Sequence, residues 1–181
     1  MIIILFGLSG AGKHHVGQVL SEYSHFHFWD ADEAITDDMK RCIEEKRLFS
    51  EEIRDDYFER VMNHMDILHK EHGNIVVSQA FYKNKNRYQC LKRFSDTLFI
   101  HVTANKEILL ARLAKRETTG SHGRAIIDEG YWEKMGAHFE APTHAYVSIN
   151  NDDNDNDESL VEQLSAIPCL NHSHLAFMKT K

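Results

Sequence analysis

A glycine-rich turn that ends in Gly-Lys lies near the start of the sequence. It follows the apolar run 2–6 and has the spacing Gly-x-x-x-x-Gly-Lys, which is typical of loops that bind nucleoside triphosphates. Glycines let the backbone turn successive N–H groups inward, and the helix after the turn adds the positive end of its dipole. The residues predicted to bind the phosphates of ATP are Gly7, Leu8, Ser9, Gly10, Ala11, Gly12, Lys13, His14 and His15.

The residue after the lysine departs from the usual pattern. Ser or Thr normally stands there and places a hydroxyl on Mg²⁺, whereas this chain has His14. Imidazole is a poor substitute because hard, hydrated Mg²⁺ prefers oxygen ligands. The sequence therefore leaves two outcomes open at this position: reduced activity, or a magnesium shell completed by water.

Two carboxylates stand at the predicted end of the second strand. Segment 25–29 reads as a strand and leads into Asp30, Ala31 and Asp32. Carboxylates two residues apart at the end of a strand point into the cleft that lies there. The alternative interpretation is that they cap a helix beginning at Glu33.

Strands and helices that must position these residues alternate along the chain. Apolar runs favour strands at 2–6, 25–29, 75–78, 98–102 and 145–149. Helical patterns cover 13–23, 34–72 with a break near 48–50, 84–94, 105–116, 126–139 and 157–166. This repeated strand–helix alternation predicts an α/β fold with a parallel sheet.

Two polar segments interrupt the alternation. Residues 117–125 are rich in Thr, Ser and Gly, a composition typical of a lid, and three arginines stand in or beside them. Those arginines are Arg112, Arg116 and Arg124. Residues 150–157 form an acidic, Asn-rich run that lacks the glycine and closing glutamate of an EF-hand, and we interpret it as a solvated loop.

Length, composition and charge restrict what the chain can be. The 181 residues are 42% hydrophobic and favour one core, so residues 1–167 are predicted to form a single domain. Residues 168–181 carry little pattern and are predicted to be a loosely held C-terminal tail. A net charge of −7 without a Lys/Arg cluster argues against binding nucleic acid but permits a local pocket for a small anionic substrate.

Cysteine usage and hydropathy favour a cytoplasmic protein. Cys42, Cys90 and Cys169 are far apart, and no CxxC pair or secretory leader accompanies them, so free thiols in a reducing compartment are expected. The apolar run before Gly7 is much shorter than the roughly 20 residues that span a bilayer. No membrane association is therefore expected.

Taken together, the motifs resemble those of the gluconate kinase family, small P-loop kinases related to shikimate kinase. The family's phosphate loop reads Gly-x-Ser-Gly-x-Gly-Lys-Ser, which this chain matches up to Lys13, and its Asp-x-Asp matches Asp30 and Asp32. The resemblance extends over about residues 2–164. Looser matches lie at 47–54, 78–88, 112–116 and 139–142. In the first of these, Leu48 and Arg54 are the residues that agree with the family's pattern.

The resemblance implies a three-layer P-loop kinase fold with a five-stranded parallel sheet and a small lid. It also implies that ATP and Mg²⁺ serve the transfer of the γ-phosphoryl group to a hydroxyl of a sugar acid, with gluconate the first candidate. In such enzymes positioning and charge neutralisation supply most of the catalysis. Lys13 would hold the β- and γ-phosphates, and Arg116 or Arg124 from the lid would stabilise the transferring group. Asp32 would receive the proton of the acceptor hydroxyl, and Asp30 and Asp32 would hold Mg²⁺ through water.

Other substrate and nucleotide contacts follow from the same resemblance. Arg54 would pair with a substrate carboxylate, because a guanidinium matches that group with two parallel hydrogen bonds. Arg112 would lie along the adenine side. Lys83 and Arg87 either contact the sugar acid or solvate the start of a helix, and the sequence does not decide between these roles.

Two further interpretations stay open. The same fold could phosphorylate another acceptor, such as shikimate, a nucleotide or an antibiotic. Alternatively, the chain binds nucleotide without transferring phosphate, because His14 replaces the hydroxyl that holds Mg²⁺. The resemblance also suggests a homodimer, which the sequence itself does not reveal.

Overall fold

Five parallel strands form the sheet at the centre of the computed structural model. The structure describes residues 1–119, 127–153 and 156–170, and for residues 116–119 the backbone alone. The strand order is β2-β3-β1-β4-β5, and every pair of neighbours is parallel. The predicted α/β fold with a five-stranded parallel sheet is therefore confirmed. The strands are β1 Ile2–Phe6, β2 His27–Asp30, β3 Ile75–Ser78, β4 Thr97–Thr103 and β5 Val147–Asn150.

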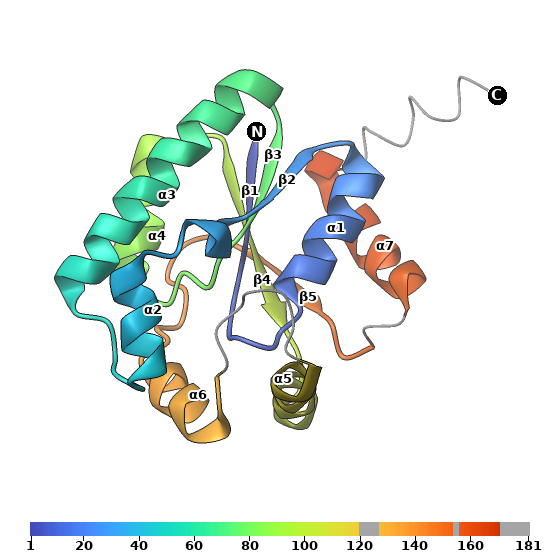
Figure 1. The fold of residues 1–181 in the computed structure, drawn as a ribbon. Coiled ribbons are helices and arrows are strands. Elements are labelled where there is room, and N and C mark those ends of the chain that lie inside the picture. Colours follow the sequence, from blue (N-terminus) through green and yellow to red (C-terminus); the bar gives the residue numbers. More distant parts are fainter. Residues whose placement is uncertain (120–126, 154–155, 171–181) are drawn as a thin grey trace.

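Helices cover both faces of this sheet and make the fold three-layered (Figure 1). The first and last helices, α1 and α7, lie together on one face, whereas α3 and α4 lie on the other. Such crossovers bring the carboxyl ends of the strands to one edge, where α/β proteins bind ligands. The helices are α1 Lys13–Ser24, α2 Asp37–Glu44, α3 Glu51–His72, α4 Asn84–Arg93, α5 Lys106–Thr119, α6 Glu129–Gly136 and α7 Asp157–Ser165.

The central strand β1 is buried along its whole length. Its residues alternate between two apolar clusters, because successive side chains of a strand point to opposite faces. Ile2, Ile4 and Phe6 join the cluster beneath α3, and Ile3 and Leu5 join the cluster beneath α1, α5 and α7. This burial on both faces explains why the strand reads as a continuous apolar run.

The long helical stretch 34–72 is divided in two, as the sequence predicts. α2 ends at Glu44, and α3 begins at Glu51. Ser50 precedes α3, and its hydroxyl oxygen accepts a hydrogen bond from the N–H of Ile53 at 3.2 Å. Ser50 therefore caps the helix and satisfies one of its unpaired N–H groups.

A short 3₁₀ turn follows β2 where the sequence suggests only a strand end or a helix cap. This turn, η1, comprises Ala31–Ala34. The carboxylate of Asp30 accepts a hydrogen bond from the N–H of Asp32 at 3.2 Å and so caps the turn. Because Asp32 lies within the turn, its backbone is fixed relative to the sheet edge.

Two boundaries differ from the sequence-based expectation. α6 begins at Glu129 rather than at residue 126, because the Asp128 carboxylate accepts the N–H of Tyr131 at 2.8 Å and caps the helix there. Residues Pro168–Leu170 form a second 3₁₀ turn, and Leu170 is only 1% exposed. The packed core thus extends three residues past the predicted domain boundary at residue 167.

The start of the acidic run 150–157 is not simply solvated, contrary to the interpretation from sequence. Asn151 is 1% exposed, and its amide Nδ2 donates to the carbonyl of Ala11 at 2.9 Å. The Asp152 carboxylate accepts two hydrogen bonds from Asn105, each of 2.7 Å. This part of the run therefore braces the phosphate loop and the start of α5.

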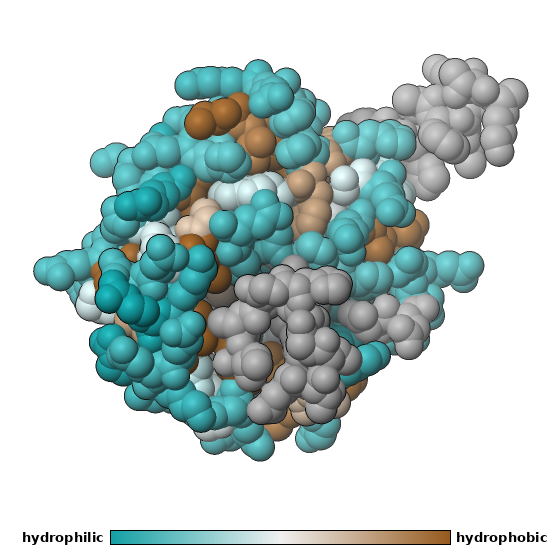
Figure 2. Space-filling view, in the orientation of Figure 1, coloured by the Kyte–Doolittle hydropathy of each residue, from teal (hydrophilic) through white to brown (hydrophobic). Residues whose placement is uncertain are grey.

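The surface on the face shown in Figure 2 is mainly hydrophilic, and hydrophobic side chains are visible there only in small patches. Within the described residues, no helix has both the length and the apolar composition that crossing a bilayer requires.

Candidate active site

A cavity of about 1050 Å³ lies at the carboxyl ends of β1, β2 and β3. Phosphate-loop residues, among them Ser9 and Lys13, line one part of it, and Asp32, Arg54 and Tyr82 line another. These residues come from segments that are distant in the sequence, from the phosphate loop to the segment after β3. The sheet edge therefore brings eight of the predicted site residues to one cavity: Ser9, Gly10, Gly12, Lys13, His14, Asp30, Asp32 and Arg54.

The phosphate loop requires glycine for two separate reasons. Gly7 has a φ angle of 141°, and a Cβ atom there would lie 2.4 Å from the carbonyl oxygen of Val102. Gly10 has a φ angle of 91°, and its Cβ atom would lie 2.9 Å from the carbonyl oxygen of Leu109. Positive φ angles and close backbone approach both exclude larger residues. The loop consequently packs directly against β4 and α5.

Lys13 folds back over this loop. Its Nζ donates hydrogen bonds to the carbonyl oxygens of Gly7 and Leu8 at 3.1 and 3.0 Å. The lysine lies at the first position of α1 and lines the cavity. Its ammonium group is therefore held beside the helix N-terminus, where an anion is favoured.

Groups behind the loop hold its carbonyl oxygens. Trp132 Nε1 donates to the carbonyl of Ser9 at 2.9 Å, in addition to the bond from Asn151 to Ala11. Arg112 donates to the carbonyls of Gly10 and Asn151 at 3.4 and 2.7 Å. Arg112 is among the residues predicted from the sequence, but Trp132 and Asn151 are not, because an isolated aromatic residue and one Asn in an acidic run carry no local signal.

The predicted carboxylates both line the cavity, and each has partners. Asp30 is 5% exposed, and its Oδ2 lies 2.7 Å from Nδ1 of His14. Asp32 accepts a hydrogen bond from Gln79 Nε2 at 3.2 Å. His14 therefore lies against the end of β2, and the amide of Gln79 orients Asp32.

A buried tyrosine completes this polar group. Tyr57 donates its hydroxyl hydrogen to the carbonyl of Ala31 at 2.8 Å and accepts a hydrogen bond from Gln79 Nε2. Burial raises the pKa of Tyr57 well above its ordinary value, and the charges of Asp32 and Asp30 add to the shift. The phenol thus stays protonated and fixes the η1 turn that carries Asp32.

Arg54 reaches the cavity from the first turn of α3. Burial lowers the pKa of its guanidinium group, although Asp55 and Glu140 oppose that shift. Its terminal carbon lies 6.0 Å from the centre of the Phe49 ring. Arg54 is therefore a partly desolvated cation in the cavity wall, and the family resemblance expects this residue to bind a substrate carboxylate.

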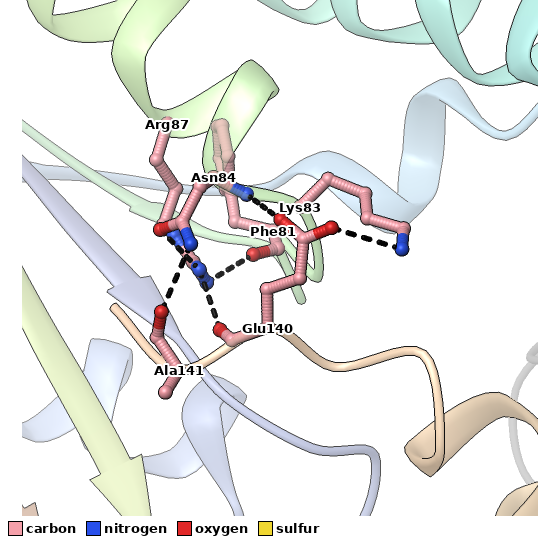
Figure 3. Close-up of polar contacts among 6 residues, drawn as sticks. All are labelled: Phe81, Lys83, Asn84, Arg87, Glu140 and Ala141. Atoms are coloured by element: carbon pink, nitrogen blue, oxygen red, sulfur yellow. Dashed lines mark hydrogen bonds and ion pairs between the residues drawn. The ribbon is translucent and has the colours of Figure 1, made fainter. Parts of the chain in front are cut away.

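Arg87 does not line the cavity, so the predicted substrate contact is wrong. Its side chain is 0% exposed, and its guanidinium donates to the carbonyls of Phe81 and Glu140 and to the Asn84 side chain, at 2.6 to 2.7 Å (Figure 3). Such a buried cation is stabilised by hydrogen bonds to the chain around it. Arg87 is a structural clamp between the segment after β3 and the segment 139–143.

Lys83 and His15 also turn to protein partners. Lys83 pairs with Glu140 at 3.1 Å (Figure 3), and the cavity lining does not include it. His15 Nε2 lies 2.9 Å from the carboxylate of Asp157 at the start of α7. Because its side chain is engaged in this way, the predicted contact of His15 with phosphate would have to come from its backbone, which lies in the first turn of α1.

The predicted lid is largely outside the described residues. α5 continues to Thr119, so Arg116 and the start of segment 117–125 belong to a helix. The side chain of Arg116 and all of Arg124 lie outside what the structure describes. Their predicted roles in catalysis therefore stay predictions.

These features define a P-loop kinase fold: a glycine-rich loop between β1 and α1 lines the same cavity as the carboxylates at the end of β2. A family model described as an AAA domain (AAA_18) matches residues 3–133, and the chain belongs to this family of P-loop kinase domains. No curated protein matches the sequence.

Solved structures of kinases share the fold at low sequence identity. A sugar kinase from Janibacter sp. HTCC2649 is 18% identical with a TM-score of 0.73, covering 93% of this chain and 96% of that one. A gluconokinase from Sinorhizobium meliloti 1021 is 17% identical with a TM-score of 0.70, covering 99% and 97%. Shikimate kinase from Aquifex aeolicus is 18% identical with a TM-score of 0.53, covering 98% and 99%. The chain is therefore similar in fold to gluconate-kinase-like P-loop kinases.

Proposed function

We propose that this chain is an ATP-dependent kinase that phosphorylates a hydroxyl group of a sugar acid, with gluconate the first candidate. One observation carries the proposal: a single cavity holds the phosphate loop with Lys13, the carboxylate of Asp32 and the guanidinium of Arg54. A loop that can bind the phosphate donor, a group that can accept a proton and a group that can bind a carboxylate are thus brought together. The fold shared with a gluconokinase and a sugar kinase supports this choice of acceptor.

Each group has a role that follows from phosphoryl-transfer chemistry. Lys13 and the loop N–H groups bind the β- and γ-phosphates, and Arg54 binds the acceptor carboxylate with two parallel hydrogen bonds. Asp32 takes the proton of the acceptor hydroxyl as that oxygen attacks phosphorus. Arg116 or Arg124 would supply the charge that stabilises the transferring group. Arg112 would lie on the adenine side of the loop.

The residues near the loop fit a magnesium ion held mainly by nucleotide phosphates and water. Mg²⁺ commonly keeps several waters and binds one or two carboxylates beside substrate phosphates. Asp30 and Asp32 supply these carboxylates, and the described residues contain no cluster of three or more metal-binding side chains. When bound, the ion would neutralise phosphate charge.

The proposal is tested by measuring ADP release with ATP and Mg²⁺, with and without gluconate. Gluconate-dependent ADP release that is lost in Lys13→Ala would support it. ADP release that does not depend on gluconate, or that survives in Lys13→Ala, would contradict it. A panel of other hydroxy acids then separates a wrong acceptor from a wrong reaction.

The contact between His14 and Asp30 favours one second candidate, a protein that binds nucleotide without transferring phosphate. It places an imidazole on one oxygen of Asp30, and the N–H of Asp32 takes the other. Under this alternative, ATP binds with the same affinity when Mg²⁺ is removed by a chelator, and no acceptor is phosphorylated. A His14→Ser variant that gains magnesium-dependent affinity would identify His14 as the cause.

A further inference from the structure

The segment after β3 is tied directly to the phosphate loop. The N–H of Gly7 donates to the carbonyl of Ala80 at 3.3 Å, and the N–H of Gln79 donates to the carbonyl of Leu5 at 3.0 Å. These bonds join the segment to the end of β1 and the first residue of the loop. The backbone of residues 79 and 80 is therefore fixed relative to the phosphate loop.

A strained residue directs the next part of this segment. Phe81 has a φ angle of 46°, in a region that aromatic residues rarely adopt. Its carbonyl accepts a hydrogen bond from the buried guanidinium of Arg87 (Figure 3). The carbonyl of Tyr82 accepts another from the N–H of Glu140 at 2.9 Å. Strain of this kind persists only where surrounding contacts enforce it. The clamp built around Arg87 thus fixes the backbone that carries Tyr82.

Tyr82 lines the cavity, and its hydroxyl makes no hydrogen bond of ordinary geometry with the described residues. The residue is 7% exposed, and Oη is buried without a hydrogen bond of ordinary geometry to any described residue, although polar groups of Ser9 lie close enough to act on it. Tyr57, the other tyrosine of the cavity lining within the described chain, has its hydroxyl fully engaged. A buried hydroxyl without a partner costs stability, which is compensated when a ligand supplies the missing hydrogen bond.

The polar neighbours of Tyr82 belong to both ends of the cavity. Burial raises the pKa of Tyr82, polar groups of Ser9 oppose this shift, and the charges of Asp32 and Arg54 act on it in opposite directions. Ser9 is part of the phosphate loop, and Asp32 is the proposed base. The hydroxyl is therefore protonated at neutral pH and belongs to the cavity wall that also contains Ser9 of the phosphate loop.

We propose that the Tyr82 hydroxyl donates a hydrogen bond to the γ-phosphoryl group of bound ATP. It distinguishes ATP from ADP, which lacks this group, and it becomes one of the donors that stabilise charge on the phosphoryl group during transfer. This inference rests on the proposed function, because it takes ATP as the ligand of the phosphate loop. It adds a binding residue that lies outside the phosphate loop.

The decisive variant is Tyr82→Phe, compared with Tyr131→Phe as the control. Both residues belong to one apolar cluster, but the Tyr131 hydroxyl donates to the carbonyl of Arg47 at 2.8 Å. Affinities for ADP and for the non-hydrolysable analogue β,γ-imido-ATP are measured by calorimetry, beside thermal unfolding without ligand. Hydrogen bonds to charged groups predict that Tyr82→Phe binds the analogue about 10- to 100-fold more weakly and leaves ADP affinity unchanged.

Stability supplies an independent readout in the same experiment. Tyr82→Phe removes an unpartnered buried hydroxyl, so it should unfold at the same or a higher temperature than the wild-type protein. Tyr131→Phe breaks a protein hydrogen bond and should unfold at a lower temperature, with both nucleotide affinities retained. A merely structural role for Tyr82 would instead lower its unfolding temperature and leave the preference for the triphosphate intact.

The remaining outcomes are equally decisive. If Tyr82→Phe weakens both nucleotides equally, or weakens neither, the inference is overturned. If the wild-type protein binds neither nucleotide, the proposed function and this inference fail together. If it binds both but phosphorylates no acceptor, the proposed function fails alone, and the loss of selectivity in Tyr82→Phe still establishes the contact.

Discussion

The phosphate end of the cavity is built from one short stretch of backbone, whereas the acceptor end is assembled from side chains of distant segments. Residues 7–13 form the loop, and their positions depend on glycine geometry and close packing on β4 and α5. The acceptor end brings together Asp32, Arg54 and Tyr82, which the Gln79 and Arg87 hydrogen bonds help to place. The phosphate end is therefore encoded mainly in consecutive residues, whereas the acceptor end depends on the tertiary structure.

The largest effect should come from Asp32→Asn, which changes the acceptor end without altering its shape. Removing the base should lower kcat by a factor of about 10² to 10⁴, because general base catalysis contributes that much. The KM for ATP should stay within about threefold, since the phosphate loop is intact. Steady-state kinetics of phosphorylation measure both parameters.

Asp56→Asn is the matched control, because Asp56 is exposed on α3 and pairs with Arg60. It should leave both kinetic parameters unchanged. Full activity of Asp32→Asn would show that Asp32 is not the base.

Gly7→Ala tests the backbone construction of the phosphate end. The new Cβ would lie 2.4 Å from the Val102 carbonyl oxygen on a residue with a φ angle of 141°. Strain and overlap together should lower the free energy of unfolding by about 3–4 kcal/mol, as measured by denaturant titration.

Gly73→Ala provides the comparison. Gly73 also has a positive φ angle, of 75°, but no atom lies within 4 Å of its added Cβ. It should lose only about 1 kcal/mol, from backbone strain alone. Equal losses in the two variants would mean that close packing on β4 does not constrain the loop.

Arg87→Met tests whether hydrogen bonds hold the acceptor end. The change leaves the carbonyls of Phe81 and Glu140 without their donors and should lower the free energy of unfolding by about 2–3 kcal/mol. Arg60→Met, which removes an exposed ion pair, should cost less than about 0.5 kcal/mol. Chemical denaturation measures the free energy of unfolding of both variants. Similar small decreases in the two would show that the Arg87 hydrogen bonds do not stabilise this part of the fold.

The smallest effect concerns His101, which is close enough to Lys13 of the phosphate loop and to the buried Arg87 to respond to their charges. Burial lowers its pKa from 6.5, and the positive charges of Arg87 and Lys13 add to that shift. The unfolded chain then binds the proton more readily than the folded one, so stability is present above pH 6.5 and declines as pH falls below that value.

His101→Gln should remove this component. The free energy of unfolding, measured at about pH 7.5 and about pH 5.5, should fall less in the variant than in the wild-type protein. An identical fall in both would show that His101 does not titrate differently in the folded state.

The difference between the two ends also explains what the sequence could predict. The phosphate loop is read directly from Gly7 to Lys13, because its chemistry depends on consecutive residues. The parallel sheet follows from apolar runs such as Ile75–Ser78, and the break before α3 from the cap at Ser50. Asp30 and Asp32 were found because they stand at a strand end.

Local sequence patterns could not predict the direction in which individual side chains point. Arg87 looked available for substrate in a basic run, but the fold buries it against the carbonyls of Phe81 and Glu140. Tyr82 and Trp132 have the appearance of ordinary core aromatic residues, and only tertiary packing shows that they face Ser9. Arg54 was identified by its family resemblance alone, and the structure places it in the cavity.

Product formation observed by ³¹P nuclear magnetic resonance tests most directly whether the two ends make one active site. The wild-type protein, ATP, Mg²⁺ and gluconate are incubated together, with Asp32→Asn and Lys13→Ala in parallel. The account predicts a phosphate monoester signal and an ADP signal that rise together and are absent or strongly reduced in both variants. Inorganic phosphate as the only new product besides ADP, or monoester formation that survives in Asp32→Asn, would contradict it.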